Sequence, residues 1–186
     1  MPHKIAILVG SLRHGSFTRM AAEALIRLAP TSLSMHIEAI GDLPLYNQDL
    51  DEQEGDRPAA WVRFRDAVRP SDGLLFVTPE YNRSVPGLLK NAIDVGSRPY
   101  GQSVFAGKPG AVMSVSPGAA GAFGANHHLR QSLVFLDVPT MQQPEAYVGG
   151  AANRFAAGGE VTDESTRKFL QSFIDAYAAW VDRFRP

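Results

Sequence analysis

Short, continuously apolar segments alternate along this chain with longer segments of helical periodicity. A strand that is apolar along its whole length is buried on both faces, which is typical of parallel sheets covered by helices on either side. The alternation therefore predicts an α/β fold, a five-stranded parallel sheet with helices on both faces and right-handed crossovers. The expected strands are Lys4–Val9, Ser34–Ile40, Gly73–Thr78, Gly110–Ser116 and Val138–Met141.

The helical segments would cover this sheet, because their apolar residues fall on one stripe. They are Ser16–Leu28, Ala59–Val68, Pro86–Val95, Ala125–Leu136 and a last helix that starts near Thr162, its expected N-cap. Gly41–Pro58 and Gly149–Glu160 are expected to be loops, and the first is long enough to be functional or mobile. Since the chain contains no linker and no repeat, residues 1–186 are expected to form a single domain.

Three loops form the candidate site, because ligands of open parallel sheets bind beside the carboxyl ends of the strands. These loops follow the first, third and fourth expected strands, at Gly10–Thr18, Pro79–Pro86 and Ser116–Gly124. Their side chains should therefore meet at one edge of the sheet.

The first of these loops, GSLRHGSFT, has the composition of a phosphate site. Small residues let backbone N–H groups converge on an anion, and the helix that follows directs its positive end to the same place. Ser11, Ser16 and Thr18 can donate hydroxyl hydrogen bonds, and Arg13 supplies a planar cation. The loop is neither a Walker motif nor a GxGxxG motif, and its donors suit a terminal phosphate monoester. The alternative is a polar turn capped by serines.

The other two loops are suited to hold a flat ring. Prolines stiffen the second loop, so its backbone groups, Tyr81 and Asn82 can contact the edge of a heterocycle. Glu80 is expected to be solvated or a backbone acceptor in preference to a catalytic acid or base. The small residues of Ser116–Ala122 permit close backbone approach to a ring or sugar. The alternatives are a rigid connector and a flexible entrance to a helix.

Several classes of chemistry are disfavoured by what the chain lacks. Without cysteine it has no disulfide, no thiolate nucleophile and no cysteine-held iron–sulfur cluster. His127 and His128 are adjacent on an expected helix and point to different sides, so no metal site is expected. No GxSxG motif supports a Ser–His–Asp hydrolase. Arg130 and Arg154 are expected to form surface salt bridges in preference to contacts with a neighbouring chain or a dinucleotide.

Charge and hydropathy narrow the range of partners. The net charge of −1 gives no electrostatic reason to expect nucleic acid or an anionic membrane. No apolar run approaches the roughly 20 residues that a membrane span needs. The first residues also lack the apolar core and cleavage site of a signal peptide, so a cytoplasmic protein is expected.

At the three loops the chain resembles a known family, the NAD(P)H-dependent FMN reductases, in the branch with bacterial quinone, chromate and azo reductases. The resemblance covers nearly the whole chain, and the combination of its segments is more specific than any one of them. The segments are GSLRHGSFT at Gly10–Thr18, TPEYNRSVPGLLKNAID at Thr78–Asp94, HLRQSLVFLDV at His128–Val138 and PEAYVGG at Pro144–Gly150.

This resemblance implies a flavodoxin-like three-layer fold with FMN bound at the three loops. The FMN phosphate would be held by Ser11, Arg13, Ser16, Phe17 and Thr18. The isoalloxazine ring would lie against Pro79, Glu80, Tyr81, Asn82 and Ser84, with Ser116 and Gly118 on its other side. Members of the family are usually homodimers or homotetramers, with the flavin near the subunit boundary.

The leading hypothesis is therefore an FMN enzyme that transfers electrons from NADH or NADPH to quinones, azo compounds, chromate or free flavin by a ping-pong mechanism. The flavin N5 would carry the chemistry, and no side chain is assigned as catalytic. One alternative is a flavodoxin-like electron carrier for a partner protein, although such carriers are typically strongly acidic. Another is a non-redox binding module. Arg83 is a candidate for contacting the 2′-phosphate of NADPH.

Overall fold

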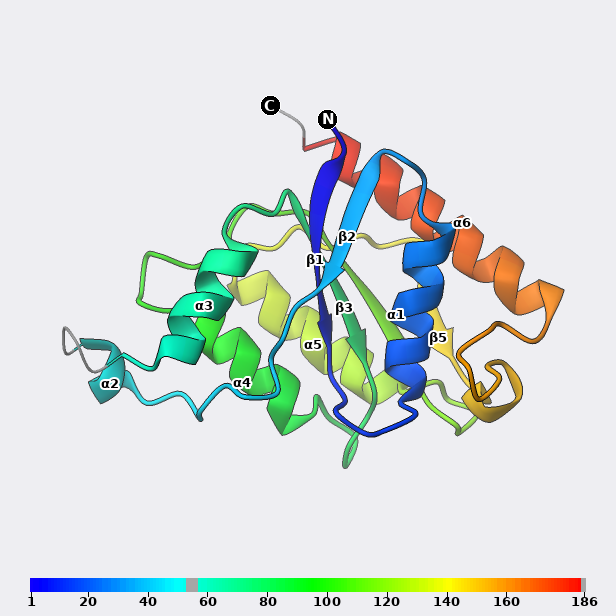
Figure 1. Ribbon diagram of the computed structural model, residues 1–186, viewed down its shortest axis with the longest axis horizontal. Coiled ribbons are helices and arrows are strands. Elements are labelled where there is room, and N and C mark those ends of the chain that lie inside the picture. Colours follow the sequence, from blue (N-terminus) through cyan, green and yellow to red (C-terminus); the bar gives the residue numbers. More distant parts are fainter. Residues whose placement is uncertain (53–56, 185–186) are drawn as a thin grey trace.

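The computed structural model describes residues 1–52 and 57–184, and Figure 1 shows helices on both sides of a central sheet. The sheet has five strands in the order β2-β1-β3-β4-β5, and every pairing is parallel. The strands are β1 (His3–Val9), β2 (Leu33–Ile37), β3 (Gly73–Thr78), β4 (Gly110–Val115) and β5 (Ala146–Val148). The predicted α/β class, strand number and parallel arrangement are therefore confirmed.

The helices are α1 (Phe17–Leu28), α2 (Gln48–Glu52), α3 (Ala59–Val68), α4 (Gly87–Gly96), α5 (Phe123–Phe135) and α6 (Glu164–Asp182). They divide between two hydrophobic clusters, one on each face of the sheet. In β1, Ile5 and Ile7 point to the cluster with α1 and α6, whereas Ala6 and Leu8 point to the cluster with α3, α4 and α5. A strand with two core faces explains its continuously apolar sequence.

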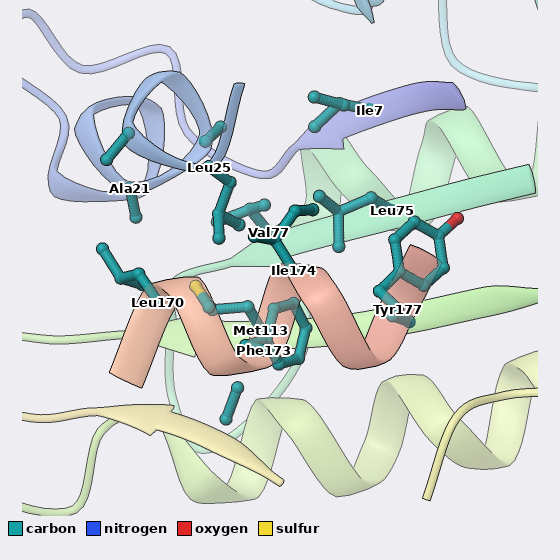
Figure 2. Close-up of a cluster of buried hydrophobic side chains, with 14 of the residues drawn as sticks. Ile7, Ala21, Leu25, Leu75, Val77, Met113, Leu170, Phe173, Ile174 and Tyr177 are labelled. Atoms are coloured by element: carbon teal, nitrogen blue, oxygen red, sulfur yellow. The ribbon is translucent and has the colours of Figure 1, made fainter. Parts of the chain in front are cut away.

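Helix α6 is tied to the sheet at its centre and at its end. Figure 2 shows Phe173, Ile174 and Tyr177 of this helix beside the β-strand side chains. The fully buried Tyr177 hydroxyl donates to the Leu74 carbonyl of β3 at 2.9 Å, and burial raises the pKa of the phenol well above its ordinary value. At the edge of the sheet where β1 begins, His3 Nε2 lies 2.8 Å from Asp182 Oδ1.

The prediction of the fifth strand was wrong. Strand β5 is Ala146–Val148, and Val138–Met141 contributes only an isolated bridge from Thr140 to Gly110. Val138 and Met141 are buried, so their apolar character reflects core packing. Pro139 interrupts this segment and has no N–H to donate to a ladder.

Other element boundaries also differ from the predictions. Strand β2 ends at Ile37, because the chain then turns so that Ile40 packs in the cluster on the opposite face. The N-cap of α6 is Asp163, whose carboxylate accepts from Thr166 N at 2.8 Å. Hydrogen bonds from Ser165 and Thr166 hold the pKa of Asp163 at about 2. Residues 151–153 form a short 3₁₀ turn inside an expected loop.

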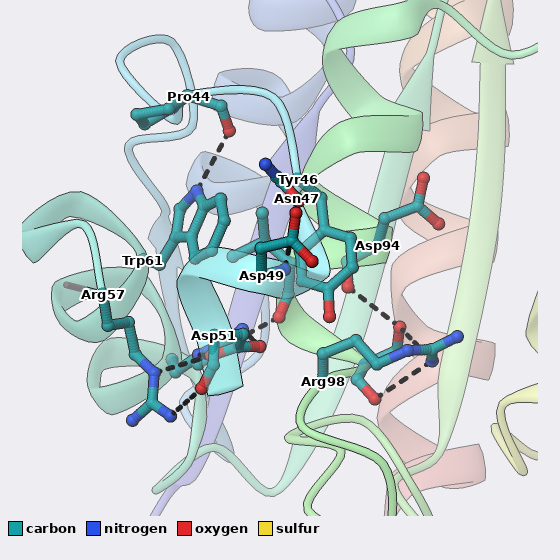
Figure 3. A network of polar contacts seen from close by, with 12 residues as sticks. Pro44, Tyr46, Asn47, Asp49, Asp51, Arg57, Trp61, Asp94 and Arg98 are labelled. Atoms are coloured by element: carbon teal, nitrogen blue, oxygen red, sulfur yellow. Dashed lines mark hydrogen bonds and ion pairs between the residues drawn. The ribbon is translucent and has the colours of Figure 1, made fainter. Parts of the chain in front are cut away.

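The connection predicted as a loop at Gly41–Pro58 contains α2, although its residues 53–56 lie outside the described part of the chain. Asp51 of this helix is buried and accepts from Arg65 Nη1 and Nη2 at 2.8 and 2.7 Å and from Arg57 Nε at 2.6 Å. Burial disfavours the Asp51 carboxylate, but these arginines lower its pKa below the ordinary range. Figure 3 shows this polar network, with the Trp61 indole donating to the Pro44 carbonyl beside it.

No helix in the described ranges, 1–52 and 57–184, is long and apolar enough to cross a membrane.

Candidate functional site

The three predicted loops meet at the carboxyl edge of the sheet, at the end opposite the start of β1 (Figure 1). They enclose a cavity of about 350 Å³, within the size range of small-molecule and cofactor sites. Its lining residues are Ser11, Arg13, Ser16, Phe17, Thr18, Pro79, Glu80, Tyr81, Val115, Ser116 and Pro117. The cavity lies where β1 and β3 lie side by side while their crossover connections leave in opposite directions, the position typical of ligand sites in open parallel sheets.

Gly10 allows the first two loops to approach each other. Its N–H donates to the Val77 carbonyl at 2.9 Å, which extends the pairing of β1 with β3. A Cβ at this position would lie 2.9 Å from Pro79 Cδ and 3.3 Å from Leu89 Cδ2. Because a real Cβ is essentially never found so close to another heavy atom, a side chain here would push the first loop away from the second.

The first loop holds its polar side chains at the start of α1. Ser16 is the N-cap, and its hydroxyl accepts weakly from Arg19 N at 3.4 Å and lies 2.7 Å from the Thr18 hydroxyl. Both side chains are almost fully buried. The first-turn N–H groups of a helix have no intrahelical acceptors, so this end of α1 attracts an anion.

Arg13 is fixed by its own loop and has no acidic partner among the described residues. Its Nη2 donates to the Gly15 carbonyl at 2.8 Å, and its guanidinium lies 5.2 Å from the centroid of the Phe17 ring. Gly15 has φ +66°, a conformation that permits this tight return of the chain. The guanidinium has five N–H donors, so most of them stay available for an anion in the cavity.

The second loop contains a hairpin with a two-residue turn. This hairpin and the prolines together make the loop rigid. Tyr81 and Ser84 exchange both backbone hydrogen bonds, at 3.2 and 3.0 Å. Asn82 and Arg83 form the turn with φ values of +51° and +65°, as in a type I′ turn. The turn residue Arg83 is exposed, and Tyr81 is about half exposed at 52%.

Glu80 is a backbone acceptor, as the sequence favoured. Its Oε2 accepts from Ala125 N, in the first turn of α5, at 3.0 Å. The side chain is only 14% exposed, and its Oε1 lies 3.5 Å from Arg83 Nη1. The N-cap residue of α5, Ala122, provides no side-chain acceptor of its own, so the carboxylate of Glu80 replaces it.

The third loop uses small residues to pack against the end of β5. Gly118 N donates to Ser116 Oγ at 2.9 Å, and the Gly118 carbonyl accepts from Gly150 N at 3.2 Å. A Cβ on Gly149 would lie 2.4 Å from the Ala119 carbonyl oxygen. Close approach of backbone to backbone therefore accounts for part of the glycine content of this region.

Nine of the twelve predicted site residues line the cavity, and Asn82, Ser84 and Gly118 do not. The Ser84 hydroxyl instead lies 3.0 Å from His128 Nδ1 on α5. Val115 and Pro117 line the cavity but were not predicted. Val115 is the last residue of β4, and Pro117 lies between two predicted residues just after it. Both could have been predicted from their position at the end of this strand.

The histidines and arginines of α5 and the segment after β5 have structural contacts. His127 and His128 contact different partners. His127 Nε2 lies 3.0 Å from the Tyr147 hydroxyl, whereas His128 contacts Ser84. Burial, together with the nearby Glu145 carboxylate, raises the pKa of Tyr147. The prediction of surface salt bridges for two arginines was wrong. Arg130 donates to Asn126 and Met141, and Arg154 donates to Gly149 and Thr166, since the chain folds carbonyls and hydroxyls around both guanidiniums.

The family model of the NADPH-dependent FMN reductases matches residues 3–153. Among curated proteins, a "Quinone reductase" of Pseudomonas putida is 63% identical over 96% of this chain and 95% of its own length. A "2-hydroxy-1,4-benzoquinone reductase" of Burkholderia sp. is 51% identical over 97% of each. The solved structure of FerB, a flavoenzyme NAD(P)H:(acceptor) oxidoreductase of Paracoccus denitrificans, matches with a TM-score of 0.91 at 45% identity and covers 98% of both chains.

Proposed function

Because this chain belongs to the NADPH-dependent FMN reductase family, we propose that it passes electrons from NADH or NADPH to quinones, using FMN bound in the cavity described above. The chain is an NAD(P)H-dependent oxidoreductase with FMN as its cofactor. The family expected from the sequence, the flavodoxin-like fold and the enzyme class are confirmed. The quinone names of the relatives support quinones as acceptors, with azo compounds, chromate and free flavin as further candidates.

The first loop is the proposed phosphate site, formed by Ser11, Arg13, Ser16, Phe17 and Thr18. The observation that carries this assignment is the uncompensated positive character of the loop. Arg13 pairs with no carboxylate in the described residues, and the N-terminus of α1 points into the same cavity. A phosphate monoester supplies the anion and the acceptors that these groups lack. The residues present therefore fit FMN at this end.

The second and third loops are the proposed ring site. Pro79, Glu80 and Tyr81 line one part of the cavity and Ser116 lines another. We propose that Asn82, Ser84 and Gly118 belong to the ring site as well. They would either contact the ring with backbone groups or act by shaping the loops that contact it. The hairpin of the second loop fixes its N–H and C=O groups, so the edge of a flat ring meets donors and acceptors that are already in position.

Bound FMN would supply hydride acceptance from NAD(P)H and two-electron transfer to the acceptor. The chain's own residues bind and orient the reactants. Glu80 is the only carboxylate among the lining residues in the described part of the chain, and it is engaged by Ala125 N. No proton transfer by a side chain is therefore assigned. Tyr81 lines the cavity and is half exposed, so we propose that nicotinamide and quinone reach the ring beside it in turn, in a ping-pong order.

We propose that the protein acts in the cytoplasm on small-molecule partners. NADH and NADPH are cytoplasmic reductants, which favours a cytoplasmic enzyme. A net charge of −1 favours small-molecule partners over nucleic acid. We also propose that residues 1–186 form one FMN-binding domain and that the protein is a homodimer or homotetramer.

Purified protein tests the proposal directly. It should carry or take up FMN and show a protein-bound flavin spectrum. Anaerobic addition of NADH or NADPH should bleach that spectrum, and a benzoquinone should restore it with steady turnover. A flavin that nicotinamides do not reduce would favour an electron carrier. A protein that stays colourless with added FMN would favour a non-redox binding module.

A further inference from the structure

The hairpin of the second loop is fastened to α5 at two points. Glu80 Oε2 accepts from Ala125 N at 3.0 Å, and the Ser84 hydroxyl lies 3.0 Å from His128 Nδ1. Between these points, a Cβ on Gly124 would lie 2.9 Å from Glu80 Oε2 and 3.0 Å from the Arg83 carbonyl oxygen. The contact between hairpin and helix is therefore as close as backbone allows.

The carboxylate of Glu80 also sets the charge at this end of the cavity. The N-terminus of α5 has the positive character of every helix N-terminus, and its own N-cap offers no side-chain acceptor. Glu80 satisfies an N–H there and supplies the negative charge. The positive end of α5 is thereby compensated within the protein, whereas that of α1, beside Arg13, is not.

From this contrast, and resting on the proposed function, we propose that Glu80 is a positioning residue for the isoalloxazine ring. Its bond to α5 fixes the hairpin that contacts the ring. Its charge offsets two positive groups at the ring end of the cavity, the N-terminus of α5 and the Arg83 guanidinium, whose Nη1 lies 3.5 Å from Glu80 Oε1. Electrons delivered to the ring add negative charge, so a nearby carboxylate lowers the midpoint potential of the flavin and favours onward transfer to a quinone.

Two variants separate the bond from the charge. Glu80→Gln keeps a carbonyl oxygen that can accept from Ala125 N, so FMN and riboflavin should bind nearly as in the wild type. The loss of the charge should raise the flavin midpoint potential. Glu80→Ala removes the bond as well, and it should weaken FMN and riboflavin by the same factor, about fivefold, which corresponds to the ~1 kcal/mol typical of one lost helix cap. Fluorescence titration gives the affinities, and a dye-equilibration titration gives the potential.

Glu164→Gln is the matched control. Glu164 is also a carboxylate in the first turn of a helix, α6, but it is 61% exposed and is not among the lining residues of the cavity. Its substitution should change neither flavin affinity nor midpoint potential. A shift equal to that of Glu80→Gln would mean that net charge alone sets the potential, and the proposal would be wrong.

The remaining outcomes are also decisive. If Glu80→Ala weakens FMN but not riboflavin, Glu80 acts on the phosphate end and the proposal is overturned. Should Glu80→Ala fail to fold, the potential of Glu80→Gln decides alone, and an unchanged value overturns the proposal. A wild-type protein that binds neither flavin would instead contradict the proposed function.

Discussion

The network around Asp51 and the loop at Gly10–Thr18 are both rich in charged and polar side chains, but only the network is balanced within the protein. Asp51 is buried against Arg65 and Arg57, and every bond of its carboxylate is made by the chain itself. Arg13, by contrast, bonds to the carbonyl of Gly15, and no carboxylate of the described residues pairs with it.

The difference indicates which region serves folding and which serves binding. Removing one member of a balanced, buried ion pair leaves an uncompensated charge in the folded state, so stability falls. Removing a cation that faces a cavity leaves nothing unpaired within the protein. Its loss should therefore appear in ligand affinity and leave stability nearly unchanged.

Asp51→Ala should have the largest effect on stability. It leaves Arg65, which is 4% exposed, without its carboxylate partner, and should lower the free energy of unfolding by about 3–5 kcal/mol. Urea denaturation of the FMN-free protein measures this loss. Asp49→Ala, at an exposed position of the same helix, is the control. A loss no larger than that of the control would contradict the assignment of the network to folding.

The stabilising effect of Asp51 should also depend on pH. Its pKa is lowered in the folded state, so its contribution is complete above the unfolded-state pKa of about 3.9 and is lost as pH falls through the folded value. The difference in unfolding free energy between wild type and Asp51→Ala should be constant above about pH 5 and shrink below about pH 4. Urea titrations across this range measure it, and a difference that stays constant at low pH would argue against an ionised Asp51.

Arg13→Ala should change binding without changing stability. Loss of charge-assisted bonds to phosphate should weaken FMN by about 1.5–3 kcal/mol, or roughly ten- to a hundredfold in Kd. Riboflavin, which has no phosphate, should bind as in the wild type. Arg19→Ala on the exposed face of α1 is the control. Equal weakening of FMN and riboflavin would place Arg13 away from the phosphate.

Ser16→Ala should have smaller effects, on both the free energy of unfolding and the affinity for FMN. Ser16 caps α1 and also lines the cavity, so its loss should cost about 1 kcal/mol of stability and weaken FMN as well. Asp163→Ala removes the cap of α6, away from the cavity, and should lower stability by a similar amount with FMN affinity unchanged. Identical behaviour of the two variants toward FMN would remove Ser16 from the phosphate site.

The sequence was sufficient to predict the central strands and the three loops, because their signals are local. The strand β3 is apolar throughout and buried on both faces, so its pattern admits one interpretation. The polar composition of the first loop is likewise contained within nine residues, from Gly10 to Thr18, and five of them line the cavity. Its position at the carboxyl edge follows from strand order.

The errors arose where distant residues decide the local structure. Strand β5 has three residues at the sheet edge, too few for a period-two pattern, and its register depends on β4. Helix α2 is held by Asp51 contacts with residues that follow it in the chain. For Glu80 the sequence favoured a backbone acceptor but could not name its partner, because the bond to Ala125 spans 45 positions and no spacing rule connects an acid in one loop to a backbone N–H in another.

The contact between His3 and Asp182 lies at the edge of the sheet remote from the three loops, and the chain contains no cysteine. A thiol introduced at the exposed Phe184, two positions beyond Asp182, would therefore be the only thiol in each chain. Attached to a gold electrode through that sulfur, the protein would stand with its ligand cavity facing the solution. Its redox currents could then be recorded while small molecules diffuse freely to the opposite end.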